Sequence, residues 1–409
     1  MTTRTGESYT MSDAVQIEAY TTLEQLEQLR TVWGSLSSHL ETDLDFFLQV
    51  VALRPEFVAP CVLVAKQEGR PAAMLVGRLE KVALRTKFMY FALPGIAIRQ
   101  FVFVCFGSSS LTAPVAEALV RHILGRLKSH EAERILLSNC ICNTPLHASA
   151  DRLPGPVMRD TIPNVTARWR LFLPESYDTF FKLMDSKKRG RLRHHVNRFE
   201  KVWGSDKKIR IFSGPQEAEQ FFAETEQIAS NSWQRSLGKG FLNNEDQQRR
   251  IRTCAGNGWW RAYMLSIKDQ PVAFWTGEFY RNEFSLLYTA YDPAYRDYRV
   301  GLVLLLQVIA DMCGLHARVI DFGVGTQQYK ERLCNDFHLE TEFKLHAPSL
   351  RGILANVLGT STAFLNKSSA VLLNRLGLEK LDPNWKAHRD LKSMRELKSM
   401  ERDYAAERD

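Results

Sequence analysis

The segment that begins at Asp321 combines residue types that can bind a ligand closely and move a proton. An apolar run ends at this carboxylate, and Gly323 and Gly325 follow at positions where a backbone without side chains can approach a ligand. Tyr329 comes next, in the first turns of a helix, where its phenol can donate a proton. We predict that Tyr329 is an acid and that Asp321 is a base or orients an acceptor. The alternatives are a tyrosine that only packs and a carboxylate that caps the next turn.

A second candidate feature lies upstream, where a strand leads into an apolar helix. The strand over residues 284–290 is followed by Tyr291, a loop, and then Arg299, Val300 and Gly301 at the start of the helix. The N-terminus of a helix presents unpaired backbone N–H groups and the positive end of the helix dipole, which suits a pyrophosphate. Arg299 would add charge. Such turns occur in any α/β protein, so this feature gains weight only together with the segment after Asp321.

The elements around these motifs occur twice in the chain. Residues 61–81 read as strand, turn and strand, and residues 262–281 repeat the pattern, with Gly77 corresponding to Gly277. In both halves a helix precedes this hairpin, and a strand, a helix and a strand follow it. The expected ranges are 23–40, 101–106, 114–128 and 135–137 in the first half, and 216–230, 284–290, 301–313 and 318–322 in the second. This self-similarity indicates an internal duplication. The alternative is coincidence, since the order of elements is a common one.

The remaining segments divide the chain into five parts. A Pro-rich stretch separates the two copies, and a charged segment, 386–409, ends the chain and is expected to be disordered. No stretch approaches the ~18 apolar residues that a membrane-spanning helix needs. The predicted parts are a disordered leader (1–14), a first domain (15–150), a linker (151–168), a second domain (169–347) and a helical, charged tail (348–409).

The composition is that of a protein that attracts polyanions. Its net charge of +8 favours nucleic acids, anionic lipids, phosphorylated cofactors and nucleotide-linked sugars alike. The seven cysteines are odd in number and lie in apolar runs, which is typical of buried thiols in a reducing compartment, so we expect a cytoplasmic protein. Cys140 and Cys142 lack zinc-site spacing, and His194 and His195 lie on different helix faces, so we expect no metal.

A strongly basic helix is expected over residues 185–203. It could bind nucleic acid, a phosphate-rich sugar carrier or a membrane surface. The alternative is a solvated helix face with Leu192, Val196 and Phe199 docked on the core.

Residues 169–344 resemble the coenzyme A-binding core of GNAT acyltransferases. The resemblance rests on the order strand, Arg/Gly turn, long helix, strand and Tyr-bearing helix, in which Tyr329 to Leu333 is similar to the family's Tyr-x-x-x-Leu segment. The Asp-Phe-Gly-x-Gly and Tyr-Lys combination resembles more narrowly the branch with CelD-type polysaccharide-biosynthesis proteins, which is related to the tandem-GNAT Fem aminoacyltransferases. The chain has only Arg299-x-Gly301 where the common pyrophosphate pattern is longer.

The resemblance implies an α/β (α+β) fold of two tandem GNAT-like domains, each a mixed, mostly antiparallel sheet flanked by helices. It also implies direct transfer of an acyl group from acetyl-CoA or another acyl-CoA, without a metal or a covalent enzyme intermediate. The first half has no Tyr-Lys counterpart, so we expect one active site. The implied residues are Tyr329, Asp321 and Lys330 for catalysis, and Arg299, Val300, Gly301, Tyr291, Gly323 and Gly325 for the cofactor. Trp233 and Arg235 are candidates for the substrate, because Trp233-Gln234-Arg235 resembles an aromatic wall for a sugar or an acyl group.

The resemblance suggests an amino sugar or a sugar hydroxyl in envelope or exopolysaccharide assembly as the acceptor, with polysaccharide-synthesis machinery as a partner. A transferase that takes an aminoacyl group from tRNA is the first alternative, and an inactive scaffold for a polysaccharide synthase is the second. Peripheral contact with a membrane stays open. Tryptophans are more often core than binding wall, and we favour the core for Trp233, Trp259 and Trp260.

Overall fold

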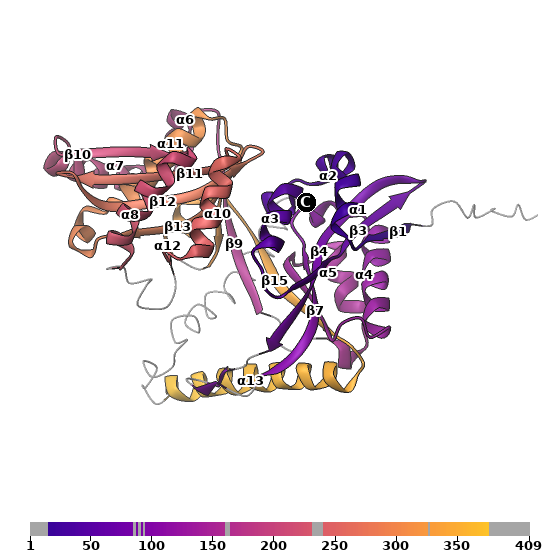
Figure 1. Cartoon of the computed structure of the whole chain (residues 1–409). Coiled ribbons are helices and arrows are strands. Elements are labelled where there is room, and N and C mark those ends of the chain that lie inside the picture. The colour runs from indigo at the N-terminus through magenta and orange to yellow at the C-terminus, as the bar shows by residue number, and fades with distance from the viewer. Residues whose placement is uncertain are drawn as a thin grey trace, which may run out of the picture. The chain divides into compact units, whose positions relative to one another are not determined.

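The computed structural model describes residues 15–84, 87–88, 91–92, 95–159, 164–230, 240–325 and 328–375. The chain forms two compact units, each with its own strands and helices (Figure 1). Unit 1 consists of residues 1–166 and 339–409, and unit 2 consists of residues 167–338. The predicted leader, Trp233, Arg235 and residues 386–409 lie outside the described residues.

The sheet of unit 1 has the strand order β1-β3-β4-β7-β8-β15, with β2 paired to β4. Its described neighbours are antiparallel except β7 and β8, which α4 connects. The strands are β1 (Gln16–Tyr20), β2 (Phe57–Pro60), β3 (Val62–Gln67), β4 (Arg70–Leu84), β7 (Ile96–Val104), β8 (Arg134–Ile141) and β15 (Asp336–His346), with a small separate pair of β5 (Lys87–Phe88) and β6 (Phe91–Ala92). The helices are α1 (Leu23–Gln28), α2 (Arg30–Leu36), α3 (Leu44–Ala52), α4 (Ala113–Lys128), α5 (Pro145–Arg152) and α13 (Leu350–Arg375).

Helices cover both faces of this sheet. The apolar side of α4 packs with α5 on the larger core cluster, which Phe101 and Phe103 of β7 help to form. On the other face, α1 to α3 bring Leu26, Trp33 and Phe47 onto β3 and β4. Successive side chains of a strand point to opposite faces of the sheet, so these strands pack against a layer of helices on each face.

Unit 2 repeats this arrangement. Its strands follow the order β9-β14-β13-β12-β11-β10, and its single parallel pair among the described residues, β13 and β14, is connected by α11. The strands are β9 (Asn164–Phe172), β10 (Lys207–Phe212), β11 (Trp260–Ile267), β12 (Gln270–Tyr280), β13 (Glu283–Tyr291) and β14 (Val319–Val324). The helices are α6 (Tyr177–Leu183), α7 (Ser186–Trp203), α8 (Ala218–Ser230), α10 (Glu245–Gly256), α11 (Val300–Gly314) and α12 (Gln328–Leu333). The predicted mixed, mostly antiparallel sheets flanked by helices are therefore confirmed.

The two hairpins that the repeat predicted match residue by residue. Each is closed by two residues with positive φ, Glu68 and Gly69 in unit 1 and Lys268 and Asp269 in unit 2, which is the hairpin turn that fits the strand twist. Each also has a one-residue register shift just before the turn. The corresponding pairs are Val64↔Met74, Ala65↔Ala73, Lys66↔Pro71 and Gln67↔Arg70, and Met264↔Phe274, Leu265↔Ala273, Ser266↔Pro271 and Ile267↔Gln270.

The boundaries of the units differ from those expected. Unit 2 ends at His338 rather than at residue 347, because β15 pairs with β8 from Glu340 to His346 and so completes the sheet of unit 1. The segment expected as a linker contains the first residues of β9 from Asn164 onward, and α13 of the expected tail belongs to unit 1. The sequence pattern of a strand does not reveal which distant strand it joins.

Within the described residues, no helix is long and apolar enough to cross a membrane.

Alanine at either of the matched glycines should destabilise the protein. A Cβ atom at Gly77 would lie 2.3 Å from a ring carbon of Phe103, and one at Gly277 would lie 2.4 Å from the carbonyl oxygen of Ser285. The strands would have to move apart, and overpacking of this kind costs about 1–3 kcal/mol. We expect Gly77→Ala and Gly277→Ala each to lower the free energy of unfolding in urea by that amount.

The control is Gly34→Ala, because Gly34 lies in α2 with no atom within 4 Å of the added Cβ. Alanine there should leave stability unchanged or raise it by up to about 1 kcal/mol. Equal effects at Gly277 and Gly34 would contradict the close approach of β12 and β13.

Candidate functional site

The parallel strands β13 and β14 separate after a short paired stretch. They pair at three positions, Glu283↔Val319, Phe284↔Ile320 and Ser285↔Asp321, and β13 then runs on to Tyr291 without a partner in β14. The backbone N–H and C=O groups along the separating edges are therefore left for other partners. The corresponding strands of unit 1, β7 and β8, stay paired from Gln100↔Arg134 to Val104↔Ser138.

A bend in β14 directs it away from β13. Gly323 has a φ of +67°, a conformation that glycine adopts without the steric cost of a Cβ. Its N–H donates to Oδ1 of Asp321 at 2.7 Å, and Nη1 of Arg168 on β9 donates to Oδ2 at 2.5 Å. Asp321 is 2% exposed, and both carboxylate oxygens are engaged. This favours the orienting alternative for Asp321 over the base.

Lys330 of α12 forms hydrogen bonds to the backbone at this bend. Its ammonium group donates to the carbonyl oxygen of Val324 at 2.7 Å and to that of Gly323 at 3.3 Å. Burial lowers the pKa of Lys330 to about 8, although the negative charge of Asp321 acts in the opposite direction. Lys330 is therefore a buried amine that changes charge slightly above neutral pH.

Tyr329 lies over β13, near the separation. Its ring centroid is 6.0 Å from that of Trp275 on β12 and 6.2 Å from that of Phe322 on β14, the two strands that flank β13. Burial raises the pKa of Tyr329, so the phenol keeps its proton at neutral pH. Within the described residues no group accepts a hydrogen bond from this O–H. A ligand at this point could accept it.

The start of α11 meets the same tryptophan. Trp275 donates its indole N–H to the carbonyl oxygen of Gly301 at 2.9 Å, and a Cβ at Gly301 would lie 3.6 Å from the ring of Tyr291. Arg299 precedes the helix in a left-handed conformation with φ +54°. The backbone N–H groups of Val300 and Gly301 have no acceptor in the described part of the chain, which is the arrangement that binds phosphate at helix N-termini.

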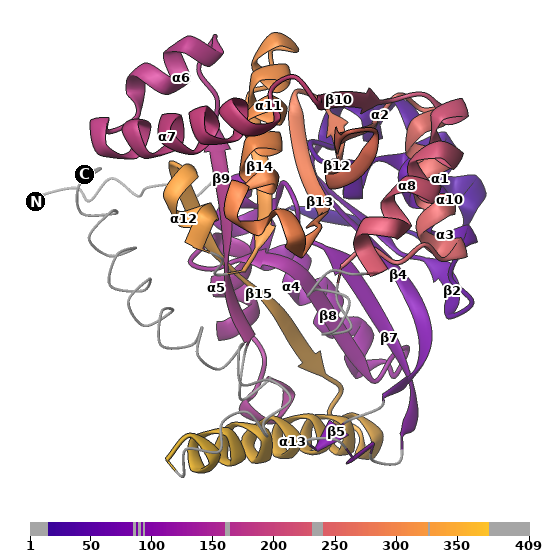
Figure 2. The ribbon, with the colours of Figure 1, turned by 90° about the vertical axis from the view of Figure 1, so that its left-hand side faces the viewer.

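Helix α7 adds positive charge beside this helix start. It packs against α11 and against the 3-10 turn Pro293–Tyr298 that precedes α11 (Figure 2). Burial, and then the charge of Arg299, lower the pKa of His195 on α7. Leu192 and Phe199 are buried as expected for docking on the core. Its exposed cations, none of which forms an ion pair with a described residue, are Lys187, Lys188, Arg191, Arg193, Arg198 and Lys201.

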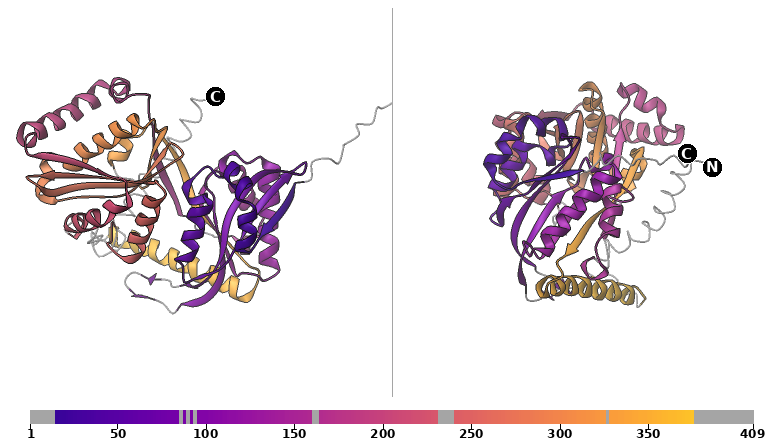
Figure 3. Two further views of the ribbon diagram at one scale, coloured as in Figure 1. Left: turned by 45° about the horizontal axis from the view of Figure 1, so that its top comes forward. Right: turned by 90° about the vertical axis from the view of Figure 1, so that its right-hand side faces the viewer.

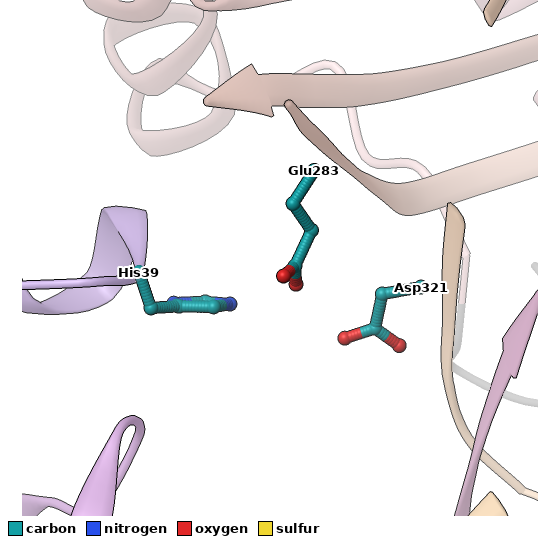
Figure 4. Close-up of side chains that lie close together, drawn as sticks. All are labelled: His39, Glu283 and Asp321. Atoms are coloured by element: carbon teal, nitrogen blue, oxygen red, sulfur yellow. The ribbon is translucent and has the colours of Figure 1, made fainter. Parts of the chain in front are cut away.

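Glu283 is a candidate that the sequence did not reveal. Its carboxylate and that of Asp321 have oxygens within 4.8 Å of each other (Figure 4; His39, also drawn there, is a residue of unit 1). Burial and the negative charge of Asp321 raise the pKa of Glu283, and the guanidinium of Arg170 is the first of three that oppose the rise. A carboxylate with a raised pKa is a better proton acceptor near neutral pH.

The acid and base candidates lie on opposite faces of the sheet. Tyr329 contacts Phe322, and because side chains alternate along a strand, Asp321 points to the other face. Ser285 pairs with Asp321, and Glu283 stands two residues before it on the same face. The separation of β13 and β14 therefore has a phenol on one side and a carboxylate pair on the other.

The structure brings most of the predicted residues into two groups. The first group is the start of α11, which consists of Arg299, Val300 and Gly301, with Tyr291 beside it. Asp321, Gly323, Gly325 and Lys330 surround the bend, where Gly325 accepts the indole N–H of Trp169 at 2.8 Å. Trp233 and Arg235 lie outside the described residues. Trp260 is 2% exposed and belongs to the core, as favoured above, whereas Trp259 is only half-buried.

One protein-family model matches the sequence, the acetyltransferase (GNAT) domain, over residues 186–331. These residues all lie in unit 2 and include α7, the start of α11, the bend and Tyr329. No curated protein matches the sequence.

Several solved structures are similar at low identity. FemX is 10% identical with a TM-score of 0.46, over 70% of this chain and 87% of that one. A tandem GNAT protein from the clavulanic acid biosynthesis pathway is 11% identical with a TM-score of 0.39, over 82% and 99%. A GCN5-related N-acetyltransferase from Kribbella flavida is 11% identical with a TM-score of 0.33, over 82% and 72%.

At these identities and TM-scores the likenesses establish no reaction, and the CelD-type branch stays a prediction. The domain match and the two repeated sheets together support the expected fold class of tandem GNAT-like domains, with a GNAT acetyltransferase domain in unit 2.

The buried amine of Lys330 should make stability depend on pH. Between pH about 8, its pKa in the folded protein, and 10.5, its ordinary value, the unfolded chain binds a proton that the folded chain has lost. The free energy of unfolding therefore rises with pH across this window. Lys330→Met lacks the titrating amine, so this rise should be absent from the variant. The free energy of unfolding of the wild type minus that of the variant should therefore increase by about 2–3 kcal/mol from pH 7 to pH 10.

Urea unfolding at both pH values measures this difference. Lys208→Met, at an exposed lysine of β10, should show no such growth. A difference between wild type and Lys330→Met that stays constant from pH 7 to pH 10 would mean that the ammonium is solvated rather than buried.

Proposed function

We propose that unit 2 catalyses the transfer of an acyl group from acyl-CoA to an amine or hydroxyl acceptor. The observation that carries this proposal is the start of α11 beside two separating parallel strands, within the segment that matches the GNAT domain. A helix start with free N–H groups suits a pyrophosphate, and unpaired strand edges suit an amide-bearing chain. Acyl-CoA contains both, in that order, and its pantetheine arm ends in the thioester that reacts.

Different residues of unit 2 would bind different parts of acyl-CoA, the acyl donor. The N–H groups of Val300 and Gly301 would hold the pyrophosphate, and Arg299 would neutralise part of its charge. The amide groups of the pantetheine arm would pair with the edge of β13. Trp275 contacts both the start of α11 and Tyr329, so an arm that passes it would bring the thioester to the phenol.

The proposed reaction is a direct transfer. The acceptor nitrogen or oxygen attacks the thioester carbonyl, and its proton passes to Glu283, directly or through water. The tetrahedral oxyanion then collapses, the C–S bond breaks, and Tyr329 donates its proton to the leaving thiolate. Asp321 and Lys330 would hold the bend of β14 and thereby the width of the separation.

The acceptor is proposed to be an amino sugar or a sugar hydroxyl used in envelope or exopolysaccharide assembly. This finer assignment rests on the CelD-type resemblance of the Asp-Phe-Gly-x-Gly and Tyr-Lys segments alone. Transfer of an aminoacyl group from tRNA is the second candidate, and the exposed cations of α7 favour it. Salt-sensitive binding of tRNA, without retention on a coenzyme A resin, would distinguish it.

Arg299→Ala should weaken the binding of acetyl-CoA about tenfold. A charge-assisted contact to phosphate at an exposed site contributes roughly 1–2 kcal/mol, and 1.4 kcal/mol corresponds to a factor of ten. Isothermal titration of the full chain with acetyl-CoA measures the change. Arg281→Ala is a matched control, because Arg281 is also an exposed arginine with a left-handed backbone, φ +47°, in a turn of the β12–β13 hairpin.

Equal weakening by both substitutions would mean a general loss of positive charge rather than a site at α11. Failure of the wild-type chain to bind acetyl-CoA or longer acyl-CoAs would favour the tRNA-dependent reaction.

Tyr329→Phe should lower kcat by about 10²-fold and change the Kd for acyl-CoA less than about twofold, because only the proton for the thiolate is lost. Stopped assays of free thiol release, with binding measured separately, give the two quantities. Tyr177→Phe, at a half-buried tyrosine of α6, serves as the control. Unchanged turnover in Tyr329→Phe would leave Tyr329 a packing residue.

A further inference from the structure

Helix α13 exposes several large apolar side chains on the side away from unit 1. The exposed residues recur three, four and seven positions apart and so form one stripe along the helix. We name the following set the α13 stripe: Leu350 (86% exposed), Ile353 (38%), Leu354 (44%), Val357 (53%) and Phe364 (60%).

The opposite side of α13 holds it against unit 1 and fixes its orientation. Gly352 and Ala355 are buried there, and a Cβ at Gly352 would lie 2.3 Å from the carbonyl oxygen of Ala347. The side-chain amide of Asn356 donates to the carbonyl oxygens of Val157 at 2.9 Å and Arg159 at 3.0 Å. Small residues thus face the unit, so rotation of the helix to bury the stripe would drive large side chains into this contact.

Figure 3 shows α13 as a continuous helix at one end of unit 1, where it contacts β5 and the 3-10 turn Pro156–Met158. An apolar stripe of this length on an outer helix is rare on a protein surface without a partner.

The charge of the helix distinguishes between partners. Residues 350–375 include Arg351, Lys367 and Arg375 and contain no Asp or Glu. A second copy of the helix would bring like charges together, which opposes pairing of the two stripes. An anionic lipid surface offers both an apolar layer for the stripe and opposite charge for the cations.

We propose that α13 lies in the interface of an anionic membrane, with the α13 stripe inserted among the lipids. The association is peripheral: the helix lies along the surface, and the apolar area together with the positive charge sets the affinity. This surface belongs to unit 1 and uses none of the residues proposed for acyl transfer, so the two proposals stand independently.

Sedimentation of the full chain with phospholipid vesicles tests this proposal. We expect binding to phosphatidylcholine vesicles that contain roughly one quarter phosphatidylglycerol to be at least about tenfold tighter than to phosphatidylcholine alone. Raising NaCl from about 0.1 M to about 0.5 M should weaken the binding, because salt screens the charged part.

Variants locate the contact. Ile353→Ser with Val357→Ser should lower the partition coefficient at least about tenfold, since two apolar side chains would no longer enter the lipid. Val58→Ser is the matched control, because Val58 of β2 is 52% exposed and Val357 is 53% exposed, both in unit 1. Leu350→Ser, at the most exposed position of the stripe, gives a single change with the least demand on folding and should weaken binding in the same direction.

Three outcomes would overturn the proposal. They are a wild-type chain that does not sediment with anionic vesicles, stripe variants that bind as the wild type does, and a dimer in analytical ultracentrifugation that the double variant dissociates. The last would mean that a second copy covers the stripe. Loss of acetyl-CoA binding plays no part in this test.

Discussion

The bend of β14 after Asp321 is the feature on which the candidate site depends. A buried carboxylate accepts one hydrogen bond from the guanidinium of Arg168 and one from the N–H of Gly323. A charge that is removed from water in this way is stable only when it is paired and hydrogen-bonded. The pair therefore fixes the backbone at the point where β14 parts from β13, and Lys330 secures the next two carbonyl oxygens.

The comparison of the two units shows why only one of them has such a site in the described residues. Both have the same strand order around one parallel pair and the same hairpin register. In unit 1 the parallel strands stay paired to Val104, and Cys105 continues with an N–H bond to Ser138. β8 also has a left-handed residue at this point, Asn139 with φ +55°, so a positive φ alone does not separate the strands. The two units thus share the same strand order and hairpin register. Their parallel strands differ, because those of unit 2 separate and those of unit 1 stay paired.

Much of the site was predictable from local sequence. Gly323 and Gly325, Tyr329 on a helix, and the turn at Arg299 to Gly301 are each short-range patterns with a local physical cause. The role of Asp321 was left open between a base and an orienting group, and the two occupied oxygens favour the second. Glu283 and Trp275 were missed, because neither carries a local signal and only strand register places them beside Asp321 and Tyr329.

The sequence by itself determined the two hairpins, the helix and strand order and the duplication, because turn residues and hydrophobic periodicity act over a few positions. The tertiary structure alone decided that β15 pairs with β8 of unit 1 from Glu340 to His346. It also decided that the parallel strands separate after Ser285, and that the α13 stripe faces outward. Each of these depends on contacts between residues far apart in the chain, and burial and register are properties of the assembled fold rather than of any segment.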